Sequence, residues 1–183
     1  SPITSPRTHP YGSSEHQCGD LYLPQTHKPA VICLLHGGFW RMPYGRDEMH
    51  AVACDLVGRG YAVWNLEYRR TGDGGGWPGT FDDVVAGVDH LAEVAAHRPI
   101  DLSRVIVAGH SAGGHLALWS AHGLRQSGKR VQPLGVAGLA AVTDLHDAHA
   151  LGAGRNAVAE LLDGSPQQQA ARYAAASPQS LLP

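Results

Sequence analysis

Cysteine is scarce in this chain of 183 residues, and its pattern excludes two structural classes. The sequence has three cysteines and no CxxC pair. They are Cys18, Cys33 and Cys54. An odd count without such a pair argues against a disulfide framework and against a zinc knuckle. The sequence therefore predicts free thiols.

Metal-ligand patterns are missing too, although the chain contains 12 histidines. The closest groupings are His110 with His115 and His146 with His149. Neither grouping has the spacing of a metal-ligand motif such as HExxH. We therefore expect these histidines to be ordinary loop and helix residues, with no bound metal and no cofactor.

The chain also lacks charge of one sign and long hydrophobic runs. Its 14 basic and 16 acidic residues give a formal net charge of -2, so no polycationic surface for nucleic acid or anionic lipid is expected. The most apolar stretch, Ala30–Leu35, is far too short to span a bilayer. No N-terminal series reads as a secretion signal. These absences predict a soluble, cytoplasmic protein without nucleic-acid or membrane partners.

Length and composition favour a single domain over residues 1–183. With 43% hydrophobic residues, the chain can bury one core but is too short for two ordinary domains. No internal repeat is visible, and the low-complexity stretches are residues 72–79 and the Gln/Ala-rich residues 167–176.

Short β-rich runs alternate with helical patterns along the chain. The expected strands are residues 17–23, 31–35, 61–66, 105–108 and 136–142, the last of them buried. The expected helices are residues 47–59, a helix from Thr80 to before Pro99, and residues 112–124. Thr80 with Asp83 resembles a capping box at the start of the second helix. The alternation predicts an α/β fold with a mainly parallel sheet and helices on both faces.

The strongest chemical signal is the GxSxG sequence at residues 109–113, between a predicted strand and a predicted helix. A serine on so tight a turn needs flanking glycines, and its Oγ is raised above the sheet at a helix N-terminus. The pattern predicts that Ser111 is the nucleophile of an acyl transfer. The plain alternative is a glycine-rich turn with an incidental serine.

The second signal is HGGFW at residues 36–40, directly after the apolar strand 31–35. Acyl transfer generates an oxyanion, which needs two or more preorganised N–H donors. We expect the amides of Gly38, Phe39 and Ala112 to form this oxyanion hole. An ordinary turn after a strand is the competing interpretation.

These two motifs resemble those of a known family. HGGFW and the GHSAGGHLA run at residues 109–117 are similar to motifs of kynurenine-formamidase-like esterases, relatives of the hormone-sensitive-lipase group of α/β-hydrolases. EYRR at residues 67–70 and GWPG at residues 76–79 also resemble segments of that family. The similarity runs from about residue 20 to residue 178. It implies hydrolysis of a carboxylic ester or an aryl formamide through an acyl-enzyme at Ser111.

The chain departs from that family where the catalytic acid and base are expected. The fold orders its triad as Ser, Asp or Glu, then His, and residues 180–183 correspond to the entry into the seventh strand. The resemblance therefore implies an incomplete domain that lacks the last strands and the usual acid and histidine, with impaired activity. Asp144 is a reserve candidate acid, for which a structural role is preferred, and His146 and His149 are candidate bases.

The sequence also has aromatic residues near these motifs and an apolar strand near its end. Phe39, Trp40, Tyr44 and Trp77 are candidates for an apolar substrate pocket, although packing is the commoner role of such residues. An unpaired strand at residues 136–142 would leave open hydrogen-bonding groups and favour self-association through the sheet edge. The alternatives to an esterase are a truncated, non-catalytic hydrolase-fold binding protein and an exopeptidase of the same fold.

Overall fold

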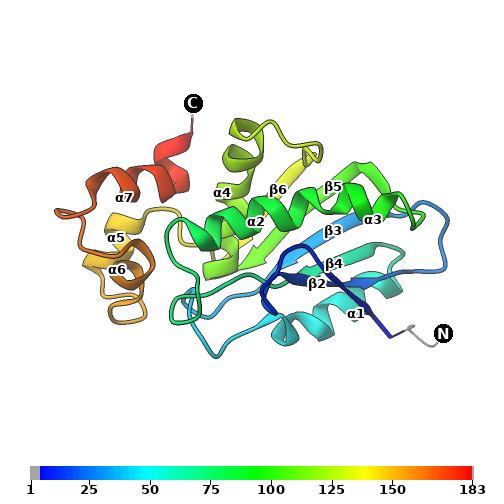
Figure 1. The fold of residues 1–183 in the computed structure, drawn as a ribbon, viewed down its shortest axis with the longest axis horizontal. Coiled ribbons are helices and arrows are strands. Elements are labelled where there is room, and N and C mark those ends of the chain that lie inside the picture. Colours follow the sequence, from blue (N-terminus) through cyan, green and yellow to red (C-terminus); the bar gives the residue numbers. More distant parts are fainter. Residues whose placement is uncertain (1–4, 183) are drawn as a thin grey trace.

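A computed structural model describes residues 5–182 and shows one six-stranded sheet with helices packed around it (Figure 1). The strands are β1 (Arg7–Pro10), β2 (Cys18–Tyr22), β3 (Ala30–Leu35), β4 (Ala62–Leu66), β5 (Asp101–His110) and β6 (Gly135–Leu139). Their order in the sheet is β1-β2-β4-β3-β5-β6. β4, β3, β5 and β6 run parallel to one another, and β2 is antiparallel to both of its neighbours, β1 and β4. The predicted α/β class with a mainly parallel sheet is confirmed.

Side chains of β3 alternate between two apolar layers. Cys33 and Leu35 belong to the larger core cluster, which includes Phe81 and Leu116, whereas Leu34 packs in a smaller cluster on the other side. Successive side chains of a strand point to opposite faces, so a central strand covered on both sides is apolar throughout. The continuous apolar run that predicted β3 therefore reflects helices on both faces.

The helices are η1 (Arg46–Met49), α1 (His50–Gly58), α2 (Gly79–Asp89), α3 (Leu91–Ala95), α4 (Ala112–Gln126), α5 (Leu145–Ala150), α6 (Ala157–Leu162), α7 (Ala170–Ala176) and η2 (Pro178–Leu181). Ala53 and Val57 of α1 pack in the smaller cluster, whereas α2 and α4 contribute to the larger one. Figure 1 shows α2 and α4 across one side of the sheet and α1 across the other.

The start of α2 differs from the predicted capping box. The residue before the helix is Pro78, and no side chain caps the helix. Asp83 is 1% exposed and accepts hydrogen bonds from Arg69 and Gln17, while the Thr80 hydroxyl donates to the Arg69 carbonyl. Both side chains therefore bind polar groups of the loop before the helix. They hold that loop in place and do not cap α2. The predicted single helix is also divided at His90 into α2 and α3.

β6 lies at the edge of the sheet, as the expected lack of the last strands implies, but it is not the buried strand that its apolar sequence predicts. It pairs only with β5 among the described strands and ends at Leu139, three residues before the predicted end. The side chain of Leu139 is 59% exposed. Its apolar sequence is the same signal that a covered strand gives, so the pattern could not distinguish the two situations.

The residues after β6 form helices that the patterns did not predict. α5, α6 and α7 gather at one end of the sheet (Figure 1). The Gln/Ala-rich segment becomes α7, and the segment expected to enter a seventh strand forms η2 instead, with Pro183 outside the described residues. β1 was missed as well, because its sequence RTHP has no alternating pattern.

Among residues 5–182, no helix combines the length and the apolar character needed to cross a membrane. The same residues contain no cluster of three or more His, Cys, Asp or Glu side chains placed to hold a metal ion.

Candidate active site

Ser111 lies on the sharp turn between β5 and α4. Its φ of 56° and ψ of -118° are rare for a residue with a side chain, and such strain is typical of functional sites. Gly113 makes the turn possible, because a Cβ at that position would lie 2.6 Å from the carbonyl carbon of Leu35 and closer still to its oxygen. A Cβ at Gly109 would similarly lie 2.8 Å from the nitrogen of Gly114. The two glycines let β5, α4 and β3 meet at the serine.

The loop after β3 reaches the same turn. Gly38, Phe39 and Trp40 all have positive φ angles, of 107°, 55° and 56°. A Cβ at Gly37 would lie 3.4 Å from the Cβ of Ser111 and 3.0 Å from the carbonyl oxygen of His110. The glycine therefore allows the loop backbone to pack directly against the serine.

Three backbone amides around this turn have unused hydrogen-bonding capacity. Within residues 5–182 the structure records no protein acceptor for the amides of Gly38, Phe39 and Ala112. Ala112 is the first residue of α4, where helix amides have no partner within the helix. These amides are the ones that the sequence predicts for an oxyanion hole.

The four candidate pocket residues lie in different environments. Phe39 and Tyr44 are 40% and 39% exposed, and the Tyr44 side chain packs over Gly38. Trp40 is only 2% exposed and donates through Nε1 to Nδ1 of His115 at 2.9 Å. Trp77 is half-buried, packs edge-on against Phe81, and lines a hollow between α2 and α4. Of the four, Phe39 and Tyr44 are therefore the ones whose side chains are exposed to solvent.

His115 connects the loop to the C-terminal helices. Because Trp40 donates to Nδ1, the proton of neutral His115 is on Nε2, which donates to the carbonyl of Ala176 at 2.8 Å. Burial lowers the pKa of His115 to about 4, and the hydrogen bond to Ala176 offsets only part of this shift. His115 is therefore neutral near pH 7 and has a structural contact on each ring nitrogen.

This lowered pKa predicts a pH-dependent stability. Between pH 6.5 and about 4 the unfolded chain binds a proton at His115 that the native chain does not, so native stability falls as the pH falls through this window. The loss should approach about 3 kcal/mol. Urea unfolding at about pH 7 and about pH 4.5 measures it. His115→Gln keeps an acceptor for Trp40 and a donor for Ala176, so its stability should depend less steeply on pH; an equally steep dependence would exclude His115 as the source.

Asp144 and the two candidate bases lie at the start of α5. Asp144 is the N-cap, and its Oδ1 accepts from the amides of His146 at 2.8 Å and Asp147 at 3.3 Å. The rings of His146 and His149 pack against Tyr173 of α7, with centroids 5.1 and 6.0 Å away. Among residues 5–182 no hydrogen bond joins the Ser111 hydroxyl to a histidine. Asp144 thus has a capping contact, and the assignment of an acid and a base stays a prediction.

Two buried carboxylates were not predicted as site residues, although Asp83 was expected at the start of a helix. Glu67 pairs with His36, at 2.6 Å between Oε1 and Nε2, and Asp83 pairs with Arg69, at 2.8 Å. Glu67 follows the apolar strand β4 directly, in the EYRR run. A charged residue immediately after a fully buried strand is the signal that could have identified it, because strand ends of parallel sheets line ligand sites.

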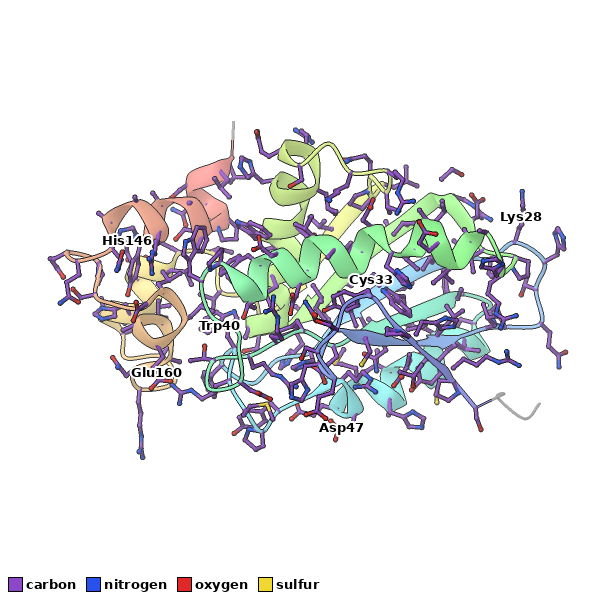
Figure 2. The ribbon with its side chains drawn as sticks, viewed as in Figure 1. Lys28, Cys33, Trp40, Asp47, His146 and Glu160 are labelled. Carbon is purple, nitrogen blue, oxygen red and sulfur yellow. The ribbon has the colours of Figure 1, made fainter. Side chains whose placement is uncertain are left out.

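The loop also contacts the helices that follow β6. Arg41 donates to the carbonyl of Gly154 at 3.1 Å and pairs with Glu160 at 3.1 Å. Gly154 itself packs against the ring of Phe39. Figure 2 shows His146 and Glu160 at the end of the molecule formed by α5, α6 and α7, with Trp40 between that end and the sheet. The site is therefore bordered by the helices on one side and the sheet on the other.

Comparisons with known proteins agree with this geometry. Kynurenine formamidase of Danio rerio is 32% identical over 110 residues, which cover 59% of this chain and 36% of that protein. The enzyme of the same name from Salmo salar is 32% identical over 111 residues, 59% of this chain and 35% of that protein. The match therefore spans about a third of the length of these curated relatives.

Solved structures share the fold at lower identity. Esterase B from Lactobacillus rhamnosis superposes with a TM-score of 0.79 at 23% identity, covering 97% of this chain and 62% of that one. A bacterial heroin esterase gives a TM-score of 0.73 at 22% identity, covering 88% and 55%. The BD-FAE family matches residues 19–182. With its α/β-hydrolase fold and its kynurenine-formamidase-like motifs, this chain belongs to the BD-FAE family of esterase-like α/β-hydrolases.

Proposed function

We propose that Ser111 is the nucleophile of a serine hydrolase that acts on carboxylic esters or aryl formamides through an acyl-enzyme. The observation that carries the proposal is the strained Ser111 turn packed against the loop at Gly37, with three free amides around it. A substrate carbonyl attacked by Ser111 Oγ would place its developing negative charge near these donors. The similarity to kynurenine formamidases and esterases supports the same class of chemistry.

The chain by itself should acylate slowly. A serine hydroxyl is a weak nucleophile at neutral pH unless a base accepts its proton. His115 has a hydrogen bond on each ring nitrogen, and His146 and His149 pack on Tyr173. An oxyanion hole and substrate binding alone still give an advantage of about 10³-fold to 10⁴-fold over water. We therefore expect a weak hydrolysis, of which only the part that passes through an acyl-enzyme depends on Ser111.

The experiment combines p-nitrophenyl butyrate hydrolysis with labelling by a fluorophosphonate, whose phosphorus is attacked by Oγ while fluoride leaves. The expected result is slow nitrophenol release and one phosphonyl adduct per chain, mapped by mass spectrometry to the peptide containing Ser111. Ser111→Ala, with a matched folding midpoint, is the control and should lose the phosphonyl adduct and the acyl-enzyme part of the nitrophenol release, while turnover from the oxyanion hole alone persists. A folded chain without Ser111-dependent signals would favour the alternative, a non-catalytic hydrolase-fold binding protein. Faster cleavage of an aminoacyl anilide would indicate an exopeptidase.

We also propose that the chain self-associates through the open edge of β6. The edge offers unpaired backbone groups, and the exposed side chains of Leu134 and Leu139 flank it, at 69% and 59% exposure. Sedimentation velocity over a concentration series should show a dimer or larger species. Leu139→Lys should shift the population toward monomer, whereas Leu151→Lys, at an 85% exposed site away from the sheet, should not. A monomer at all concentrations would exclude the edge as an interface.

A further inference from the structure

A buried ion pair lies beneath the loop that reaches Ser111. His36 is 0% and Glu67 3% exposed, and Nε2 of His36 is 2.6 Å from Oε1 of Glu67. The two residues directly follow Leu35 and Leu66, which are partners in the parallel pairing of β3 and β4. The register between β3 and β4 therefore places His36 and Glu67 next to each other.

The Glu67 carboxylate is held by several donors. Burial alone would raise the pKa of Glu67, but the hydrogen bond and charge of His36, the amide of Arg46 and the charge of Arg70 outweigh it and lower the pKa. The amide of Arg46 donates to Oε2 at 3.0 Å, and the amide of Tyr68 donates to Oε1 at 3.2 Å. Glu67 is therefore an ionised acceptor in a fixed position.

Both ring nitrogens of His36 face hydrogen-bond acceptors. Its Nε2 faces the Glu67 carboxylate, and its Nδ1 lies 2.7 Å from the carbonyl oxygen of Gly37. Each ring nitrogen is therefore placed to donate to an oxygen. The ring also stacks on Tyr68, with centroids 4.4 Å apart and planes within 5°. The imidazole ring is thus held between a carboxylate and a peptide carbonyl.

The carbonyl that accepts from His36 belongs to the same peptide group as the amide of Gly38. A hydrogen bond to a carbonyl polarises its peptide and strengthens the N–H as a donor, and a charged donor does so most strongly. The Gly38 amide has no recorded protein acceptor, and Gly37 packs against Ser111. A hydrogen bond from His36 can thus act on the oxyanion through one peptide group.

We propose that Glu67 and His36 are positioning residues that fix and polarise the Gly37–Gly38 peptide as an oxyanion donor. This inference rests on the proposed function of Ser111. A purely structural ion pair would also favour the charged ring of His36, but its loss would leave the donor strength of Gly38 and the rate of Ser111 phosphonylation unchanged, so the two roles differ in measurable ways.

The test uses Glu67→Gln, which preserves the shape of the side chain and removes its charge. Asp89→Asn is the control, because Asp89 is likewise a carboxylate paired with a cation, the Arg130 guanidinium, and accepts from a backbone amide, that of Val131, with no contact to the loop. Three quantities are compared in the full chain: the ¹⁵N signals of the His36 ring, the amide signal of Gly38, and the rate of Ser111 phosphonylation. The unfolding midpoint of each variant is measured alongside.

In the wild-type chain we expect two protonated ring nitrogens on His36 near neutral pH. In Glu67→Gln one of them should lose its proton, the Gly38 amide signal should move upfield, and phosphonylation should slow by about tenfold, less than the full loss of a donor. Asp89→Asn should change none of the three. A neutral His36 in the wild-type chain, or an unchanged Gly38 signal and rate in Glu67→Gln, would overturn the inference. If His36 and Gly38 respond as expected but no chain is labelled at Ser111, the polarised peptide is supported and the proposed function fails.

Discussion

Replacing Gly113 with alanine is expected to prevent folding or to lower the free energy of unfolding by more than about 4 kcal/mol. The added Cβ would lie 2.6 Å from the carbonyl carbon of Leu35 and closer to its oxygen, in the middle of the contact between α4 and β3. Neither backbone segment can move without separating the helix from the sheet. Urea unfolding followed by circular dichroism measures the loss.

Gly58→Ala is the matched control for this substitution. Gly58 is the last residue of α1, and a Cβ there meets nothing within 4 Å. Alanine has the higher helix propensity, so Gly58→Ala should be neutral or stabilise the chain by up to about 1 kcal/mol. Similar unfolding curves for the two variants would show that the close approach at Gly113 does not restrict the residue type.

Replacing Asp83 with alanine should lower the free energy of unfolding by about 3 kcal/mol, because a buried hydrogen-bonded carboxylate is lost while its partner Arg69, 30% exposed, keeps access to water. Asp83 accepts from the amide of Arg69 at 2.8 Å, from its guanidinium at 2.8 and 2.9 Å, and from the side chain of Gln17 at 2.8 Å. Its removal leaves these donors without an acceptor inside the protein, and the Arg69 guanidinium without its countercharge.

The neighbouring Asp82 provides the control for position and charge. It lies on the same turn of α2 but is exposed. Asp82→Ala should therefore change the free energy of unfolding by less than about 1 kcal/mol, since exposed charges contribute little. If Asp82→Ala lowered the free energy of unfolding as much as Asp83→Ala, the effect would come from the negative charge at the start of the helix and not from the contacts of Asp83 with the loop.

The sequence predicted those parts of the fold that have a local physical signal. β3 was found because a strand covered on both faces is apolar throughout, β4 because it is apolar except for Asn65, and α4 because a glycine-flanked serine follows a strand. The open edge at β6 was expected from the family resemblance, which implies that the last strands are missing, and not from the sequence of β6 itself. Whether an apolar strand is central or at an edge depends on its neighbours in space, and no property of residues 135–139 encodes them.

The candidate site was predictable where chemistry requires a particular residue type. Ser111 and the loop glycines are specified by strain and close approach, so they are visible as motifs. The buried pair of His36 and Glu67 was not predicted, because it depends on the register between β3 and β4. Trp40 shows the converse: its place in the HGGFW motif suggested a pocket wall, and the structure buries it against His115.

Long separations in the sequence also govern when this site can form during synthesis. Arg41 meets the carbonyl of Gly154 across 113 positions, Trp40 meets His115 across 75, and His115 meets Ala176 across 61. Contacts of this kind close large loops and form late in folding. The loop beside Ser111 therefore acquires its last supporting contacts only when the segment up to Ala176 has emerged from the ribosome, and shorter nascent chains expose it without them.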